Sequence, residues 1–223
     1  MSSVKVFAPA TIGNIGPGFD TLGLAIQGMG DTIEARDIPG NEIVIEKIQN
    51  ADHHISTDPK KNTAGIAASE ALKLLGSTQG INLVITKGLP AGSGLGSSAA
   101  SAAAGACAIN MLLGNKLNKE KLLKAAMVGE YSVSGGYFAD NVAPAIYGGA
   151  TLTRSIDPLH ITPIGTISDL IIILAIPDIQ LLTRKSRQVI PSKVELSDCI
   201  HNMANTASIT AAFCKDDYTL LKD

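Results

Sequence analysis

The stretch between Lys87 and Lys116 contains no charged residue, and its first part reads GLPAGSGLGSSAAS. The residues just before it, INLVITK, have the composition of a β-strand, and small residues with helical spacing follow it. A glycine-rich turn between a strand and a helix lets backbone N–H groups and the positive end of the helix face an anion. The sequence therefore predicts a phosphate-binding loop. Ser97 and Ser98 add hydroxyl groups for a phosphate or for a magnesium ion on the phosphates.

Two well-known phosphate loops fit this stretch poorly. A Walker loop requires a lysine that is absent here. A dinucleotide fingerprint that starts at Gly92 requires glycine where Ser97 stands, and the acidic residue expected about 20 positions later is missing. The plainer alternative is a helix of small residues packed tightly into a core, and Ala99, Ala102 and Gly105 suit that role as well. A phosphate loop and a buried helix can exist together.

Composition excludes several classes of protein. In a chain of 223 residues, 45% hydrophobic and 17% charged residues exclude intrinsic disorder. A net charge of −2, 4% aromatic residues and no tryptophan argue against binding of nucleic acid. The odd set Cys107, Cys199 and Cys214, without a C-x-x-C spacing, is typical of reduced thiols. We expect a cytoplasmic chain with no membrane partner, because neither a signal peptide nor a long apolar run is present.

Strand and helix patterns alternate irregularly along the chain. Strands are expected at 4–8, 22–26, 31–36, 42–48, 81–87, 151–154 and 170–176, and helices at 63–75, from the loop to about 113, at 118–131 and, as one helix or two, at 195–215. Turns are expected at 12–18 and 140–149. This order predicts an α+β fold or an open α/β sandwich, with a border near 155–166, and excludes a repetitive barrel.

One run of the loop, Pro90-x-x-x-Gly94-Leu-Gly96-Ser97-Ser98-Ala-Ala, resembles the phosphate-loop signature of the GHMP kinases. Three further stretches, which begin at Ala8, Ala139 and Thr183, resemble the homoserine kinase branch of that superfamily. They read APATIGNIGPGFDTLG, ADNVAPAIYGG and TRKSRQVIP. Together the four stretches keep the order of the family over most of the chain.

The resemblance implies a two-lobed α+β kinase. Residues 1–154 would form the N-terminal, ATP-binding lobe, with a fold similar to domain 2 of a small-subunit ribosomal protein, and residues 155–223 would begin a C-terminal α/β sandwich lobe. The implied reaction moves the γ-phosphate of ATP, with Mg²⁺, to the side-chain hydroxyl of L-homoserine. The product, O-phosphohomoserine, is the substrate of threonine synthase. Homodimers are common in the family, so a homodimer is one expected assembly.

Two departures accompany the resemblance. Nothing after Thr206 resembles the C-terminal glycine-rich motif of the family, so we expect a truncated chain whose second lobe is incomplete. Phe138 stands where homoserine kinases often carry histidine, which removes one polar group near the acceptor.

The resemblance also assigns residues to the nucleotide and the metal. The phosphates of ATP would lie on Pro90, Gly92, Ser93, Gly94, Leu95, Gly96, Ser97, Ser98 and Ala99. Ser98 and Glu130 would hold magnesium, which prefers oxygen ligands. The alternative for Glu130 is a solvated carboxylate at a helix end.

The acceptor would be held by Asn14, Asp20, Asn141, Thr183 and Arg187. An Asp20 carboxylate suits the ammonium group of an amino acid, and the guanidinium group of Arg187 suits its carboxylate. The alternative for Asn14 and Asp20 is turn chemistry, in which such side chains bind their own backbone. The alternative for Arg187 is an exposed charge on a turn.

Asp140, Asn141 and Arg187 are the candidate catalytic residues. In mevalonate kinases and galactokinases, which belong to the superfamily that the chain resembles, a carboxylate near this position is the proposed base, and Asn141 can orient the acceptor hydroxyl. A dedicated base is not obligatory for a loose transition state, so no residue is assigned as the base.

Two other functions stay open at this point. One is another small-molecule kinase of the same superfamily, such as a mevalonate or shikimate kinase, although the stretches that begin at Ala139 and Thr183 argue against it. The other is a nucleotide-binding fragment without catalytic activity, which the missing C-terminal motif suggests. Turnover that depends on the acceptor would distinguish an enzyme from such a fragment.

Overall fold

The computed structural model describes residues 2–222 apart from 52–53, 91 and 177–185. A six-stranded sheet in the order β3-β4-β2-β5-β6, with β1 paired to β2, forms one layer. The strands are β1 (Ser3–Gly13), β2 (Leu22–Ile38), β3 (Ile43–Gln49), β4 (Gly80–Thr86), β5 (Ala150–Ile156) and β6 (Leu159–Gly165). The helices are α1 (Thr63–Leu74), α2 (Ser97–Leu112), α3 (Lys119–Ser134), α4 (Val142–Tyr147), α6 (Leu196–Lys215) and the short 3-10 helix η1 (Tyr218–Leu221). The predicted α+β class is confirmed.

The long strand β2 connects the two halves of the sheet. Its first residues pair with β5, its later residues pair with β4, and β1 runs antiparallel to it along its length. The separate strands expected at 22–26 and 31–36 are therefore one continuous strand. The pairing of β1 shifts register between Pro9 and Ala10, as expected where a proline interrupts the ladder of N–H donors.

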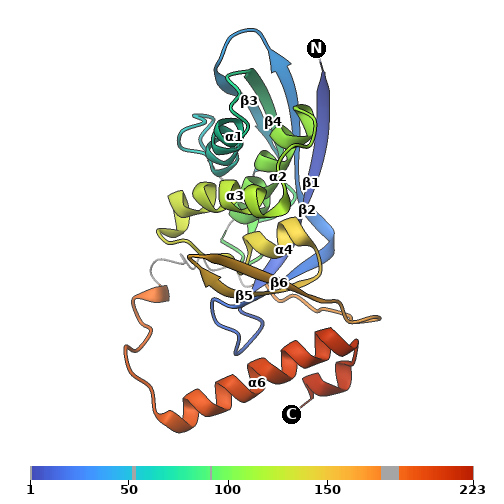
Figure 1. Ribbon diagram of the computed structural model, residues 1–223, viewed down its shortest axis with the longest axis vertical. Helices are drawn as coiled ribbons and strands as arrows, with labels where there is room; N and C mark the ends of the chain where they lie inside the picture. Colours follow the sequence, from blue (N-terminus) through green and yellow to red (C-terminus); the bar gives the residue numbers. More distant parts are fainter. Residues whose placement is uncertain (1, 52–53, 91, 177–185, 223) are drawn as a thin grey trace.

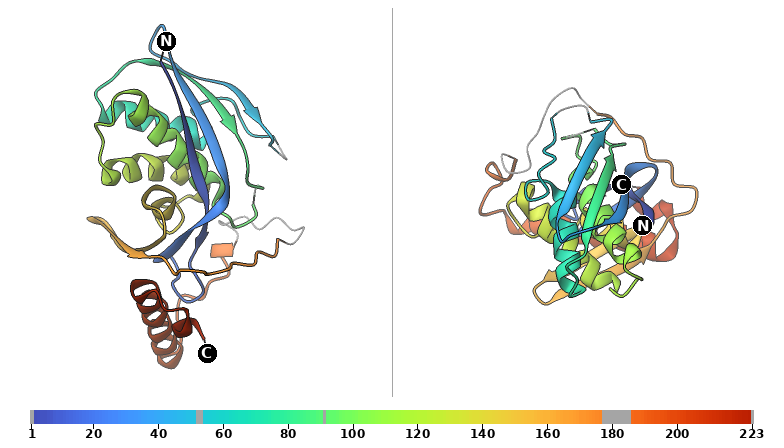
Figure 2. Two further views of the ribbon diagram at one scale, coloured as in Figure 1. Left: turned by 90° about the vertical axis from the view of Figure 1, so that its right-hand side faces the viewer. Right: turned by 90° about the horizontal axis from the view of Figure 1, so that it is seen from above.

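Helices α1, α2 and α3 cover one face of the sheet, as Figures 1 and 2 show. Helix α2 lies at the centre of this layer and is buried on nearly all sides, which its alanine-rich sequence allows. A Cβ atom at Gly105 would collide with the backbone of Ala64, and one at Gly129 would collide with the carbonyl oxygen of Thr63. The three helix axes therefore approach closely only because these two residues lack side chains.

The predicted caps of two helices are present. The side chain of Asn62 accepts a hydrogen bond from the N–H of Ala64 at the start of α1, and that of Asn118 accepts one from Lys121 at the start of α3. Such caps satisfy backbone donors that a first turn leaves free.

Three expectations are corrected. Residues 170–176 form no strand, and Ile171 and Ile173 are 87% and 91% exposed. Residues 140–149, expected as turns, contain the helix α4. Helix α3 continues to Ser134, so Glu130 lies one turn before its end.

Helix α6 lies at one end of the molecule, apart from the helical layer (Figure 1). Only Ala212 and Phe213 of this helix are buried, in a small cluster with Leu22 and Leu24 of β2 and residues of the β5–β6 region. No helix among the described residues is long and apolar enough to span a membrane.

Candidate active site

The loop between β4 and α2 has the backbone of an anion-binding turn. Gly92, Gly94 and Gly96 all have positive φ angles of 63–75°, which favour glycine. Gly96 precedes α2, and no side chain caps the helix. The free N–H groups of its first turn, together with Ser97 and Ser98, are therefore available to phosphate oxygens.

A buried charged cluster supports this loop from below. The ammonium group of Lys87 forms an ion pair with Asp31 and donates hydrogen bonds to the carbonyl oxygen of Ser97 at 3.1 Å and to the hydroxyl of Ser101 at 2.8 Å. Asp31 is fully buried, and it also accepts from the hydroxyl of Ser101 at 2.6 Å and from the N–H of Gly88 at 3.0 Å. The cluster therefore fixes both ends of the loop to β2.

Glu130 on α3 reaches across to the start of α2. Its Oε1 accepts a hydrogen bond from the hydroxyl of Ser98 at 3.0 Å, and its Oε2 is shielded from solvent without a hydrogen-bond partner among the described residues. Burial raises the pKa of Glu130 to about 7, against the opposing effect of the Ser98 hydrogen bond. A shielded carboxylate oxygen beside a serine hydroxyl fits a magnesium ion, which binds one or two carboxylates together with substrate phosphates and water.

Two cavities meet at three residues of this region. The first, of about 300 Å³, lies over the phosphate loop and is also lined by Asn62 and Lys87. The second, of about 250 Å³, lies on the other side. Both cavities are lined by Gly94, Glu130 and Asn141. A group bound in one cavity therefore faces a group bound in the other across these residues.

The second cavity carries an ion pair. The guanidinium group of Arg187 donates two hydrogen bonds to the carboxylate of Asp20, at 3.0 and 2.5 Å, and lies 3.6 Å from the centre of the Phe138 ring. The side chains of Arg187 and Asp20 are 29% and 31% exposed, so solvent reaches both. Asn14 Oδ1 accepts from the N–H of Asp20 at 2.8 Å, so the turn chemistry considered for Asn14 is present.

Asp140 and Asn141 lie at the floor of the second cavity, before α4. Asn141 Nδ2 donates to Asp140 Oδ2 at 3.2 Å, and Asn141 Oδ1 accepts from the hydroxyl of Thr11 at 3.0 Å. Burial, followed by the charge of Asp20, raises the pKa of Asp140 to about 6, while Arg187 acts in the opposite direction. Asp140 is therefore mostly ionised at neutral pH but close enough to its pKa to exchange a proton.

Most of the residues predicted for the site lie around the two cavities, but not all in the same way. The side chains of Leu95 and Ala99 are buried in the core, so these two residues offer only backbone groups to a ligand. Pro90 lines neither cavity, and its carbonyl oxygen accepts from the hydroxyl of Ser93. Thr183 lies outside the described residues.

Three residues of this region have contacts that the sequence did not indicate. In the sequence, Lys87 marks only the boundary of the uncharged stretch, although a lone lysine directly before a glycine-rich loop is a usable signal. Phe138 replaces a polar residue in the sequence, and in the structure its ring faces the guanidinium group of Arg187. Thr11 gave no signal, because its partners lie far away in the sequence.

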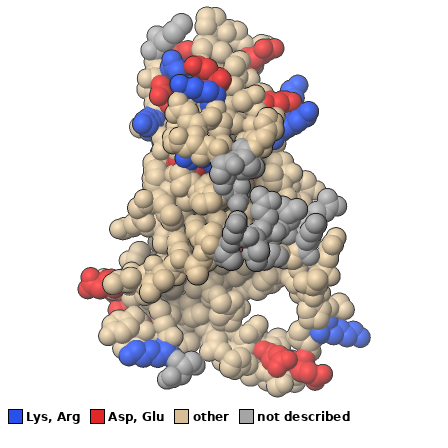
Figure 3. All heavy atoms as spheres, turned by 180° about the vertical axis from the view of Figure 1, so that it is seen from behind, with Lys and Arg blue, Asp and Glu red and all other residues tan. Residues whose placement is uncertain are grey.

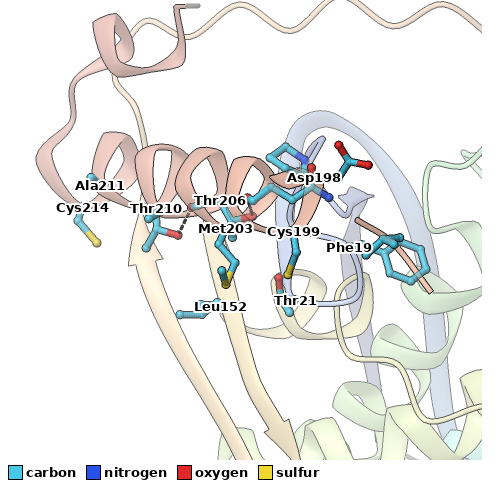
Figure 4. A pocket seen from close by; sticks show the side chains of 14 residues that line it. Phe19, Thr21, Leu152, Asp198, Cys199, Met203, Thr206, Thr210, Ala211 and Cys214 are labelled. Atoms are coloured by element: carbon cyan, nitrogen blue, oxygen red, sulfur yellow. Dashed lines mark hydrogen bonds between the residues drawn. The ribbon is translucent and has the colours of Figure 1, made fainter. Parts of the chain in front are cut away.

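A third cavity, of about 710 Å³, lies beneath α6 (Figure 4). Cys199 and Met203 point from the helix toward Thr21 and Leu152. Asp198 is the one carboxylate among its described lining residues. This cavity therefore lacks the combination of charges and free backbone donors present at the first two.

Charged side chains of both signs are present on the face of the molecule drawn in Figure 3. On the face drawn in Figure 3, positive and negative side chains are mixed near the two ends of the molecule, and the described residues form no broad patch of one sign there. The absence of a nucleic-acid partner stays a prediction from the net charge and the low aromatic content of the sequence.

Comparison with known proteins adds family evidence to this geometry. Residues 62–149 match the family model of the GHMP kinase N-terminal domain. The homoserine kinase of Arabidopsis thaliana is 44% identical over 98% of this chain and 60% of its own length, and that of Methanococcus maripaludis strain S2 is 39% identical over 99% and 72%.

Solved structures agree with the sequence comparison. The crystal structure of homoserine kinase from Cytophaga hutchinsonii has a TM-score of 0.88 and 39% identity, and the match covers 99% of this chain and 70% of that one. The mevalonate kinase of Methanococcus jannaschii, at 17% identity and a TM-score of 0.58, shares the fold alone. The chain spans 60% of the Arabidopsis relative and about seven tenths of the other two homoserine kinases. From the phosphate loop, the joined cavities and these relatives together, we conclude that the chain belongs to the homoserine kinase family of the GHMP kinases.

Proposed function

We propose that this chain provides the nucleotide site and much of the acceptor site of an enzyme that transfers the γ-phosphoryl group of ATP to the hydroxyl of L-homoserine. The observation that carries the proposal is the junction of the two cavities at Gly94, Glu130 and Asn141. A phosphoryl group passes from donor to acceptor only when both are held in line and close together. The relatives named homoserine kinase favour homoserine as the acceptor.

The nucleotide belongs in the cavity over the phosphate loop. Backbone N–H groups at 94–98 and the start of α2 would bind the phosphates, and Lys87, which is paired with Asp31, holds the backbone of the loop in place through the carbonyl oxygen of Ser97. Ser98 and Glu130 would hold Mg²⁺, which neutralises charge on the phosphates when it is bound. The unpartnered Oε2 of Glu130 supports this assignment.

The acceptor belongs in the cavity with Asp20 and Arg187. An amino acid carries an ammonium and a carboxylate group, and these match the two charged side chains. In the present structure Asp20 and Arg187 bind each other. Homoserine would separate this pair, with its ammonium group on Asp20 and its carboxylate on Arg187.

Asp140 and Asn141 would act on the reacting hydroxyl. The bond between the γ-phosphorus and the bridging oxygen breaks, a bond to the homoserine oxygen forms, and the hydroxyl proton leaves. Asp140 is able to accept that proton, because it is ionised at neutral pH and lines the same cavity. Asn141 would orient the hydroxyl toward the phosphate.

We further propose, from what is common in the family, that the enzyme works in the cytoplasm and that a homodimer is one of its assemblies.

The test is release of ADP from Mg-ATP with homoserine, mevalonate, shikimate or no acceptor. Release that requires homoserine is expected. Release with mevalonate or shikimate but not with homoserine would contradict the choice of acceptor. ATP binding without release for any acceptor would instead support a nucleotide-binding fragment, and titration with a fluorescent ATP analogue measures that binding directly.

A further inference from the structure

Thr11 on β1 contacts both halves of the site. It is fully buried. Its backbone N–H donates to the carbonyl oxygen of Leu95 in the phosphate loop at 3.1 Å, and its hydroxyl donates to Asn141 Oδ1 at 3.0 Å. A Cβ atom at Gly96 would collide with the Thr11 hydroxyl, so the last glycine of the loop packs directly against it.

The Thr11 hydroxyl determines which way the amide of Asn141 faces. An amide has a donor end and an acceptor end, and its orientation follows from its partners. Because Thr11 donates to Oδ1, the Nδ2 group is directed to Asp140 Oδ2 at 3.2 Å. The side chain of Asn141 makes no hydrogen bond to cap α4, so these two contacts hold it.

We infer that Thr11 is a positioning residue, which fixes the Asn141 amide relative to the phosphate loop and so sets how the acceptor hydroxyl meets the phosphate. The inference rests on the proposed function, in which Asn141 faces that hydroxyl. One rigid strand holds the loop through its backbone and the amide through its side chain. The two reactants are thereby aligned by a group that touches neither.

The first test compares three variants with the wild type. Thr11→Val keeps the volume of the side chain and removes the donor, whereas Thr11→Ser keeps the donor. Thr151→Val is the matched control, because Thr151 is equally buried and its hydroxyl has no hydrogen-bond partner among the described residues. We expect Thr11→Val to lower kcat with homoserine by about tenfold to a hundredfold, with little change in the KM for ATP, because misplaced reacting groups slow the step far more than they weaken binding.

Thr11→Ser should restore most of the lost kcat, and Thr151→Val should leave it unchanged. A Thr11→Val enzyme as active as the Thr151→Val control would overturn the inference. Melting temperatures of all three variants show whether any loss comes from unfolding. If Thr11→Val does not fold, Thr11→Ala removes the same donor and is measured in the same way.

The second test does not depend on turnover. The side-chain amide signal of Asn141 in a ¹H–¹⁵N spectrum is identified by its loss in Asn141→Asp. We expect it to shift in Thr11→Val and to stay in place in Thr11→Ser and Thr151→Val. An unmoved signal in Thr11→Val overturns the inference, even if kcat falls.

The two tests also separate this inference from the proposed function. If the wild type releases no ADP with homoserine, the proposed function fails for this chain, and the amide signal alone decides the role of Thr11. If the wild type phosphorylates homoserine while Thr11→Val matches its control, the proposed function stands and the inference fails.

Discussion

The proposed nucleotide side and the proposed acceptor side of the site are held together in different ways. On the nucleotide side, Lys87 and Asp31 are 6% and 0% exposed and are tied to the backbone of the phosphate loop. On the acceptor side, Asp20 and Arg187 are about a third exposed and are held chiefly by each other. The nucleotide side is therefore formed by folding itself, whereas the acceptor side holds an ion pair that, in the proposed function, the acceptor would replace.

The largest expected effect is on the free energy of unfolding, which should depend far more on the buried ion pair than on the partly exposed one. Lys87→Met leaves the Asp31 charge buried and unpaired, and we expect a loss of about 3–5 kcal/mol in the free energy of unfolding. Arg187→Met breaks a pair that is about a third exposed, and we expect a loss of at most about 1 kcal/mol. Urea unfolding of both variants measures the two values. Equal losses would show that the two sides are held alike.

The next effect concerns turnover. Glu130→Gln removes the charge that would hold magnesium, and we expect kcat to fall by about a hundredfold or more, since a bound metal supplies several kcal/mol of charge stabilisation. The control is Glu120→Gln on the same helix, where Glu120 forms an exposed pair with Lys124. If Glu130→Gln is as active as this control, the assignment of Glu130 to the metal site is wrong.

A smaller effect should separate the two substrates. Arg187→Gln removes the proposed partner of the homoserine carboxylate, and we expect the KM for homoserine to rise by roughly tenfold or more, the usual cost of a lost hydrogen bond to a charged group. The KM for ATP should stay near the wild-type value, because Arg187 lines only the acceptor cavity of the two. Equal rises in both KM values would reject the assignment.

The smallest effect is a shift in pH dependence. The pKa of Asp140 is raised to about 6, and the ionised form is the one that accepts a proton, so activity should fall as the pH drops through about 6. Because Arg187 lowers this pKa, Arg187→Gln should move the acidic limb toward higher pH by less than about one unit. Rate profiles at saturating magnesium measure the limb. A shift toward lower pH would contradict the assigned electrostatics.

The sequence could predict features that depend on neighbouring residues, but not contacts between residues that lie far apart in the chain. The loop was predictable as a phosphate site because its signal is local: closely spaced glycines at 92, 94 and 96 and the helix that follows them. Asp20 and Arg187 were both predicted near the acceptor, but their pairing was not. They lie 167 positions apart, and only the folded chain shows that they meet. The Lys87–Asp31 pair, 56 positions apart, was missed for the same reason.

Local patterns failed where the surroundings decide the structure. Residues 170–176 are rich in β-branched residues, yet they form no strand, because a strand requires a partner and the described chain offers none there. The turn expected at 140–149 proved to be α4. Pro144 lies in the first turn of that helix, where the missing N–H of proline costs nothing.

The close approach at Gly129 has a consequence for natural variation. Its Cα faces the carbonyl oxygen of Thr63 and the side chains of Ala67 and Ala102, and the next residue is Glu130. Even an alanine there would push α3 away from its neighbours and carry Glu130 away from Ser98. A population of related genes should therefore tolerate changes at many surface positions of α3 while it eliminates nearly every substitution of this one glycine.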